Sequence, residues 1–288
     1  MTSGTPNNSF YKAAPTGIYI PEKPVVHRDE EYDPTNLDML AAMQLQHFWY
    51  LGRHRFLYRA LMREIRGSAD LRAADLGGGC GGWIKYLADR SPGKFAELAI
   101  ADSSLRALEF AQSLLGGNIK PYQVDLLRLN WHQRWDVVFL LDVLEHIPEH
   151  VEVLLQVKES LRPGGLLFVT APALRFFWSY YDEVFHHIRR YSRNDLAELA
   201  EQSGLELRYT RYFMFFLSPL VFLARMKKLD PNNMSKEEIQ EQMRRAHRIP
   251  VAPINQALRL IFSLETPLGL WLPFPWGTSV LGVFRRAR

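Results

Sequence analysis

The chain has 288 residues, 47% of them apolar, so it is long enough to bury one large core. Its net charge of +4 at pH 7 is too small to indicate a nucleic-acid-binding protein. The single cysteine, Cys80, excludes an internal disulfide, and we expect it to be a small packing residue. Neither a signal peptide nor a membrane-spanning segment is predicted, so we expect a cytoplasmic protein.

The N-terminal part of the chain divides into two segments. Residues 1–35 are rich in Ser, Thr, Asn and Pro, which predicts a flexible arm. Residues 36–66 have apolar side chains near helical spacing and predict a helical lid. The lid contains an aromatic and cationic cluster, His47–Arg55, in which neighbours on a helix diverge by about 100°. These aromatic residues either pack on a sheet or cover a ligand.

Strands and helices then alternate. Apolar strands are predicted at 71–76, 95–101, 119–124, 135–141, 166–170, 205–213 and 279–284, with helices between the first six. Alternation of this kind predicts an α/β, Rossmann-like, seven-stranded and mostly parallel sheet with helices on both faces. We assign residues 67–216 and 276–288 to this core. Residues 217–275 break the pattern and predict a helical insertion or cap before the last strand.

A glycine-rich loop follows the first core strand, with Gly77, Gly79 and Gly81 after Asp75. Glycines let a backbone approach a ligand closely, and dinucleotide-dependent dehydrogenases use the same device. The acidic residues near this loop favour a ligand other than a dinucleotide. Asp75 could meet an ammonium group but would repel a pyrophosphate, while Asp102 and Asp125 end the next two strands, where they could accept from ribose hydroxyls and an adenine amino group.

Five segments in order resemble the class I S-adenosylmethionine methyltransferases. They are Ala74–Gly82, Ala101–Asp102, Val124–Asp125, Leu141–Ile147 and Leu161–Thr170. The resemblance implies S-adenosylmethionine as the cofactor and S-adenosylhomocysteine as the product. It also implies cofactor contacts from Ser103, Leu126 and Asp142 in addition to the glycines and acids above. We expect Tyr50 or Arg53 of the lid to meet the methionine carboxylate.

The segment after the fifth core strand resembles a subgroup of these enzymes with Trp-x3-Asp-Glu and His-x-Arg-Arg-Tyr patterns. The subgroup implies a small-molecule, sugar or lipid-linked acceptor. His187 is either a general base or a histidine bonded to Asp182 or Glu183. The arginines either hold an anion or anchor the loop. The candidate catalytic residues are His187, Tyr191 and His146, and the candidate acceptor-binding residues are Trp178, Tyr181, Glu183, Arg189 and Arg190.

We therefore expect methyl transfer to oxygen or nitrogen of a small or lipid-linked acceptor. C-methylation of a diphosphate is an alternative, as are a nicotinamide-dependent dehydrogenase and a non-catalytic membrane or interaction module. The apolar run and cations of residues 213–228 are typical of an interfacial segment, although a cap or a homodimer would also bury them. No zinc-type spacing is visible and no stacking platform for nucleic acid, so neither a metal nor a nucleic-acid partner is expected.

Overall fold

The computed structural model describes residues 10–25, 37–117, 119–225, 234–235, 238, 241–242, 245 and 248–288. The expected arm over 1–9 and 26–35, and most of the polar part of the expected insertion, lie outside the described residues. None of the helices in the described part of the chain is long and apolar enough to cross a membrane.

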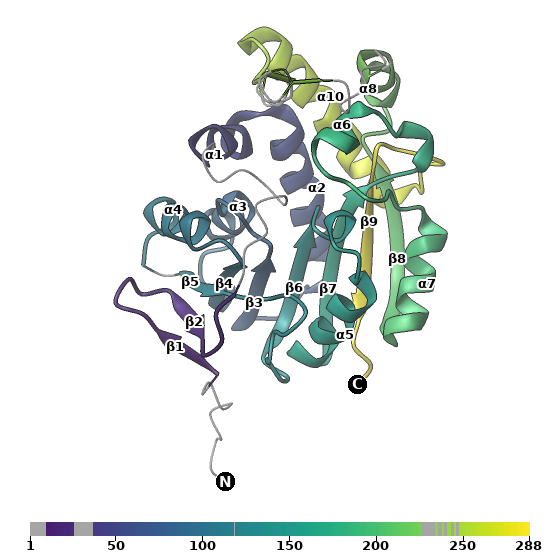
Figure 1. Cartoon of the computed structure of the whole chain (residues 1–288). Helices are drawn as coiled ribbons and strands as arrows, with labels where there is room; N and C mark the ends of the chain where they lie inside the picture. The colour runs from purple at the N-terminus through teal and green to yellow at the C-terminus, as the bar shows by residue number, and fades with distance from the viewer. Residues whose placement is uncertain are drawn as a thin grey trace.

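One mixed sheet organises the molecule (Figure 1). Its spatial order is β1-β2-β5-β4-β3-β6-β7-β9-β8, and the run from β5 to β7 is parallel. β9 lies antiparallel between β7 and β8. The strands are β1 (Tyr11–Ala13), β2 (Tyr19–Pro21), β3 (Leu71–Leu76), β4 (Phe95–Asp102), β5 (Ile119–Gln123), β6 (Trp135–Leu141), β7 (Leu161–Pro172), β8 (Glu206–Phe213) and β9 (Ser279–Arg285).

The sheet has nine strands, so the expected number of seven was wrong. The two additional strands, β1 and β2, form an antiparallel pair inside the expected arm, and β2 continues the sheet beside β5. Burial of Tyr11 explains why this part of the expected arm is ordered as strands. Tyr11 is 4% exposed, donates to the carbonyl oxygen of Leu129 at 2.8 Å and contacts the ring of Tyr122. A partner ring 111 residues away is invisible to local composition.

Helices cover both faces of the sheet, as expected. Buried side chains of successive strand residues alternate between two core clusters, because a strand turns neighbouring side chains to opposite faces. Ala73 packs on the face covered by α2 and α3, whereas Ala74 packs on the face covered by α5 and α7. The helices introduced so far are α2 (Phe48–Glu64), α3 (Gly82–Arg90), α5 (His150–Ser160) and α7 (Arg193–Ser203).

The other helices lie mainly toward one end of the sheet. Figure 1 shows α1 and α6 at the end toward which β6 and β7 point. Several local predictions are confirmed: α4 has the expected bounds, and Ser192 begins α7 with the expected capping box to Asp195. The remaining elements are α1 (Leu37–Gln46), α4 (Leu105–Leu115), α6 (Tyr180–Val184), α8 (Ser218–Arg225), α10 (Ala252–Trp271), η2 (Leu144–His146) and η3 (Arg175–Phe177).

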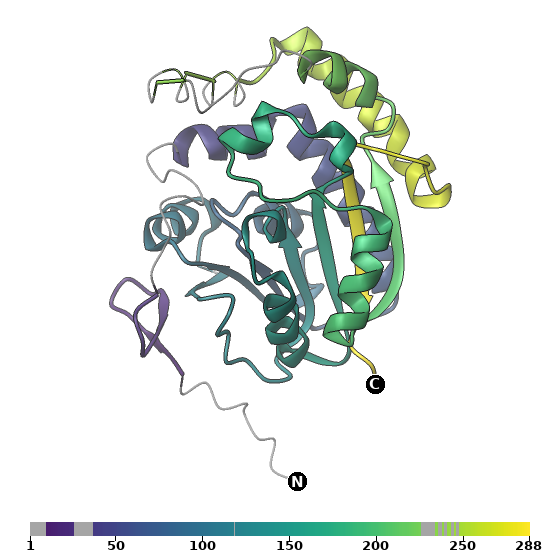
Figure 2. The same ribbon diagram turned by 45° about the vertical axis from the view of Figure 1, so that its right-hand side comes forward.

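The segment between β8 and β9 contains α8 and α10, and α10 runs alongside α2 (Figure 2). Polar contacts tie the two helices together at both ends. Asn255 accepts the backbone N–H of Phe48 and donates to the carbonyl oxygen of Gln46, both at 2.9 Å. Near the other end, Arg63 donates to the carbonyl oxygen of Leu270 at 3.0 Å. The insertion is therefore packed on the predicted lid.

Helices α2 and α10 pack tightly at Gly52, where a Cβ atom would lie 2.0 Å from the buried Phe262 ring. We expect Gly52→Ala to lower the free energy of unfolding by about 2 kcal/mol, since the ring has no free volume to enter. Chemical denaturation measures this. The matched control is Gly117→Ala, where the added methyl meets no atom within 4 Å and stability should stay unchanged or rise slightly. Equal stability of the two variants would contradict the described packing.

Candidate active site

Four aspartates lie at or just beyond the carboxyl ends of adjacent parallel strands. Asp75 and Asp102 are in β3 and β4, while Asp125 and Asp142 follow β5 and β6. The strands themselves are apolar because helices cover both faces, so charged side chains concentrate where the strands end. The structure therefore brings the predicted acidic residues to one edge of the sheet, which is where ligands bind in folds of this class.

The glycine loop is held against the end of β4. Gly77 and Gly78 donate their N–H groups to the carbonyl oxygen of Ala101, at 2.8 and 3.2 Å, and Gly79 donates to Oδ2 of Asp102 at 2.9 Å. Gly77 has φ +69°, and a Cβ atom there would lie 2.6 Å from Val143. At Gly79, by contrast, a Cβ atom would meet nothing within 4 Å among the described residues. The loop thus has one tightly packed glycine and one that borders open space.

Asp102 is buried, and each of its carboxylate oxygens accepts a backbone N–H, from Gly79 and from Ser104. An ionised carboxylate has about four acceptor positions, so each oxygen can accept further bonds. Ser104 also begins α4, where its Oγ accepts the N–H of Ala107 at 3.3 Å. The predicted residue Ser103 instead offers its carbonyl oxygen to Gln123 at 3.0 Å. Of the two adjacent serines, Ser104 is therefore the one that caps the N-terminus of α4.

Asp75 is the most deeply buried of the four aspartates, at 2% exposure. No hydrogen bond to its carboxyl group is found among the described residues. Burial raises its pKa to about 7, with a smaller contribution from the nearby negative charge of Asp102, while Arg53 acts in the opposite direction. The site therefore contains a carboxyl group that a cationic ligand would ionise.

Helices α1 and α2 cover this edge through polar contacts. Gln44 of α1 accepts the N–H of Gly82, the first residue of α3, at 2.8 Å. Arg53 of α2 forms an ion pair with Asp142, and its guanidinium lies 5.0 Å from the Trp49 ring and 5.2 Å from the Tyr50 ring. Burial raises the pKa of Tyr50 to about 12. Neither the Gln44 contact nor the pairing of Arg53 with Asp142 was predicted, because both join residues far apart in sequence.

Asp125 and Leu126 lie on the loop after β5. Oδ1 of Asp125 accepts the N–H of Leu127 at 2.9 Å, which fixes a tight turn directly after the strand. Both residues are partly exposed, unlike the buried strand that precedes them.

Cys80 lies in the glycine loop, packed with Leu37, and burial raises the pKa of its thiol to about 12. The expected packing role of Cys80 fits this position.

A second polar cluster follows β7. The buried carboxylate of Asp182 accepts from Nδ1 of His187 at 2.9 Å, from Nε and Nη2 of Arg190 at 2.7 and 3.0 Å, and from the N–H of Ser179 at 2.8 Å. Burial alone would raise its pKa, but these bonds outweigh burial and lower the pKa to about 2. His187 is thus bonded to Asp182, which was one of its two predicted roles, and Arg190 anchors the loop.

The other predicted residues of this segment are distributed over both its buried and its exposed sides. Tyr191 is 1% exposed, and its hydroxyl group donates to the carbonyl oxygen of Leu144 at 3.2 Å and meets Nδ1 of His150 at 2.8 Å. Trp178 donates to Glu183 at 3.4 Å on the outer side. Arg189 donates to the carbonyl oxygen of Pro148 at 3.2 Å, and Arg225 lies 5.0 Å from the ring of Tyr181.

The two clusters approach each other at η2. His146 of η2 and His187 have ring centroids 4.9 Å apart, and the N–H of Ile188 donates to the carbonyl oxygen of Glu145 at 2.9 Å. Burial, with the charges of the neighbouring histidines, lowers the pKa of His146 to about 4. Glu145 was not predicted as a site residue, although it stands in the Asp-Val-Leu-Glu-His segment beside two that were.

Comparisons with known proteins indicate the family and the fold of the chain. A family model described as "Methyltransferase domain" matches residues 41–210. Trans-aconitate 2-methyltransferase from Methylobacterium nodulans is 34% identical over 114 residues, which are 39% of this chain and 42% of that protein. The chain thus aligns with less than half the length of this relative.

Two solved structures show the same fold at low identity. Phosphoethanolamine N-methyltransferase 2 from Haemonchus contortus, in complex with S-adenosyl-L-methionine, has a TM-score of 0.58 and 15% identity, covering 94% of this chain and 62% of that chain. The [4+2]-cyclase SpnF also has a TM-score of 0.58 and 15% identity, covering 90% of this chain and 94% of that chain. Since one of these proteins is a cyclase, the fold by itself does not define the reaction.

The Arg53–Asp142 ion pair generates a stability prediction. The two side chains are 6% and 21% exposed, so Asp142→Asn would leave a largely buried guanidinium without its counter-charge. We expect the free energy of unfolding to fall by about 2 kcal/mol. Asn tolerates the φ of +58° at this position, so the backbone is not a competing cause.

The control for this measurement is Asp89→Asn, which removes an exposed ion pair with Lys85. Such pairs are worth about 0.5 kcal/mol or less. Chemical denaturation of both variants tests the difference, and an Asp142 variant as stable as the Asp89 variant would show that the buried pair does not hold α2 on the sheet.

Proposed function

Because this chain belongs to the methyltransferase domain family, we propose that it transfers the methyl group of S-adenosylmethionine to an oxygen or nitrogen atom of a small acceptor. The observation that carries the proposal is the set of carboxylates around an open glycine loop at one edge of the parallel sheet. S-adenosylmethionine supplies an activated methyl group on a sulfonium and carries no phosphate, so acidic neighbours suit it.

Each acidic residue has a suitable partner group on such a ligand. Asp102 is held by two backbone N–H groups and can still accept bonds from two ribose hydroxyls. Asp125 lies on the next loop, where it would accept from the adenine amino group, with Ser103 and Leu126 beside it. The buried Asp75, whose carboxyl group has no hydrogen bond among the described residues, would pair with the methionine ammonium group. A dinucleotide would place its pyrophosphate near Asp75, which makes the dehydrogenase alternative unfavourable.

The methionine carboxylate would meet the lid. Arg53 points its guanidinium at Asp142 and lies against Trp49 and Tyr50. A guanidinium has five N–H donors, so it can hold Asp142 and a ligand carboxylate together. The lid helices would thereby order around the bound donor and exclude water from the methyl group.

The acceptor side would be provided by the segment after β7. In methyl transfer the acceptor lone pair attacks the methyl carbon, the carbon–sulfur bond breaks toward sulfur, and the acceptor proton is released. Asp182 holds Nδ1 of His187 as a donor, which leaves Nε2 free to take that proton. His146 lies next to this ring, whereas the buried Tyr191 would position η2 through its bond to Leu144.

The outer surface of the insertion favours an acceptor with an apolar part. Leu260, Leu264 and Trp271 of α10 are 60%, 60% and 74% exposed, and Leu223 of α8 is 64% exposed. Arg259 is the one charged residue of α10 that is exposed, because Glu265 is buried. An exposed apolar face on α10 beside a cation suits contact with an anionic membrane surface, where lipid-linked acceptors reside. The Lys227–Lys228 part of the expected interfacial segment lies outside the described residues.

Transfer of radiolabel from methyl-labelled S-adenosylmethionine tests the reaction. Carboxylates, alcohols and amines would be offered in solution, and lipid-linked hydroxyl compounds in vesicles of anionic phospholipid. We expect label in at least one O- or N-acceptor class, and a loss of about 100-fold or more in kcat/KM for Asp102→Asn. Arg208→Gln, which removes an exposed ion pair, is the control and should keep full activity. Cofactor binding without transfer to any acceptor would point to a non-catalytic module.

The raised pKa of Asp75 predicts a proton release when the donor binds. With a pKa of about 7, the carboxyl group is about half protonated at pH 7, and a bound ammonium group would ionise it. Calorimetric titrations in two buffers of different ionisation enthalpy should therefore show about half a proton released at pH 7 and less at pH 8. In Asp75→Asn both this release and most of the affinity should be lost. Proton release that persists in the variant would assign it to another group.

A further inference from the structure

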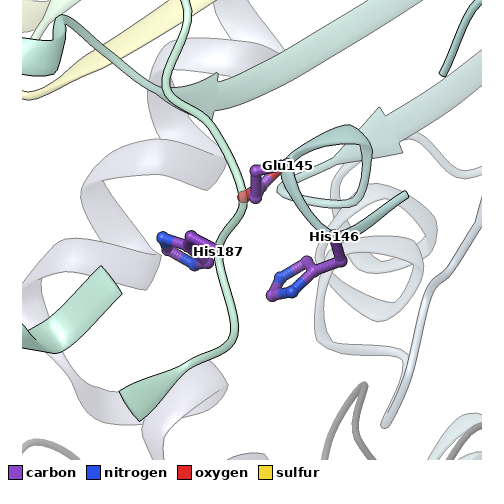
Figure 3. A group of neighbouring side chains, drawn as sticks. All are labelled: Glu145, His146 and His187. Carbon is purple, nitrogen blue, oxygen red and sulfur yellow. The ribbon is translucent and has the colours of Figure 1, made fainter. Parts of the chain in front are cut away.

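The geometry points to a divalent metal site formed by Glu145, His146 and His187. This cluster was not expected from the sequence, where no zinc-type spacing is present. Each of the three residues has one ligand atom that lies within 4.8 Å of the ligand atoms of the other two. Figure 3 shows the three side chains around one space, with Glu145 and His146 coming from η2 and His187 from the segment after α6.

The carboxylate of Glu145 is only weakly compensated by the described residues. The residue is 0% exposed, and neither Oε1 nor Oε2 has a hydrogen-bond partner among the described residues. Nδ1 of His146 is also buried without a partner there. A buried carboxylate with little compensation is strongly unfavourable when ionised, and protonation or a bound cation removes that penalty. Burial and the charge of Asp142 raise the pKa of Glu145 well above its usual value, although its own backbone N–H, Arg53 and Arg190 act in the opposite direction.

His187 is oriented as metal-bound histidines usually are. Its Nδ1 donates to the buried Asp182, so Nε2 carries the lone pair. Arg190 and the N–H of Ser179 hold Asp182 in turn. The bond from Ile188 to the carbonyl oxygen of Glu145 fixes the second segment to η2. The site therefore has ligands from two segments, and hydrogen bonds between protein groups hold both segments in place.

Two imidazoles and one carboxylate suit a first-row divalent ion such as Zn²⁺, Co²⁺, Mn²⁺ or Fe²⁺, and leave coordination positions for water or substrate. Bonds of about 2.1 Å would bring tetrahedral ligand atoms about 3.4 Å apart. The ligand atoms now lie within 4.8 Å of one another, so binding requires these separations to close by up to about 1.4 Å. His146 is only partly buried, and rotation of its side chain would bring it closer to the other two ligands.

The role of the ion rests on the proposed function, although its binding does not. A cation here would hold an oxygen of the acceptor, which narrows the acceptor class to hydroxyl or carboxylate compounds. It would also lower the pKa of a bound hydroxyl group. His187 would then serve as a ligand, and the acceptor proton would leave to water.

Binding can be measured without cofactor or acceptor. The full chain, without an affinity tag and stripped by a chelator, would be titrated with Co²⁺ and followed by its visible absorption, and with Zn²⁺ by calorimetry. We expect one equivalent to bind. Glu145→Gln and His187→Gln should each weaken binding by about 100-fold or more. The matched control is His186→Asn, a neighbouring exposed histidine at φ +55° where Asn is tolerated, and it should bind like the wild type.

A wild-type protein without Co²⁺ absorption bands would overturn the proposal, as would a Glu145 variant that binds like the wild type. If a variant does not fold, the thermal shift of the wild type decides the question: Zn²⁺ should raise Tm, and His186→Asn should show the same rise. No rise would count against the site. Titration of S-adenosylmethionine into metal-free protein tests the proposed function separately.

Discussion

The central strands β4, β3, β6 and β7 are covered by helices on both faces, and this burial is the constraint on which the rest of the structure depends. Buried strands must be apolar along their length, so charged groups are restricted to the ends. In parallel strands the carboxyl ends meet at one edge. The four aspartates at this edge are therefore a consequence of how the sheet is built, and they make this edge acidic.

A second constraint concerns the helices outside the alternating core, which cover this edge of the sheet. The helices α1 and α2 come from before the first core strand, and α10 comes from before the last strand. Close contact at Gly52 and the pairing of Arg53 with Asp142 join them to the edge of the sheet. A ligand at the aspartates would thus be bounded by segments at both ends of the chain, which makes binding and packing of the lid interdependent.

The segment after β7 shows how one buried charge can organise several others. Asp182 fixes His187 and Arg190, and these two residues had competing interpretations as catalytic or anion-binding groups. Their bonds to Asp182 use Nδ1 of the histidine and two nitrogens of the arginine. What remains available is Nε2 of His187, beside His146 and the unpartnered Glu145. The groups of this region that can bind a ligand or take up a proton are therefore few and lie close together.

The sequence alone was sufficient for the elements that depend on local pattern. Strands β3 and β6 and helix α4 have the expected bounds, because their apolar periodicity and end signals lie within a dozen residues. The acidic strand ends and the glycine loop supported the resemblance to class I methyltransferases, which was correct at the level of the family. These features follow from short-range constraints on the chain.

Tertiary structure decided the rest, because contacts between distant residues leave no periodic trace in the sequence. The composition of residues 10–25 gave no sign that Tyr11 would find a buried site beside Tyr122 and extend the sheet. Likewise, Gln44 meets Gly82 and Arg53 meets Asp142 only after the lid packs on the sheet edge. Glu145 and His187 are 42 positions apart, and only the folding of the segment after β7 onto η2 makes them neighbours.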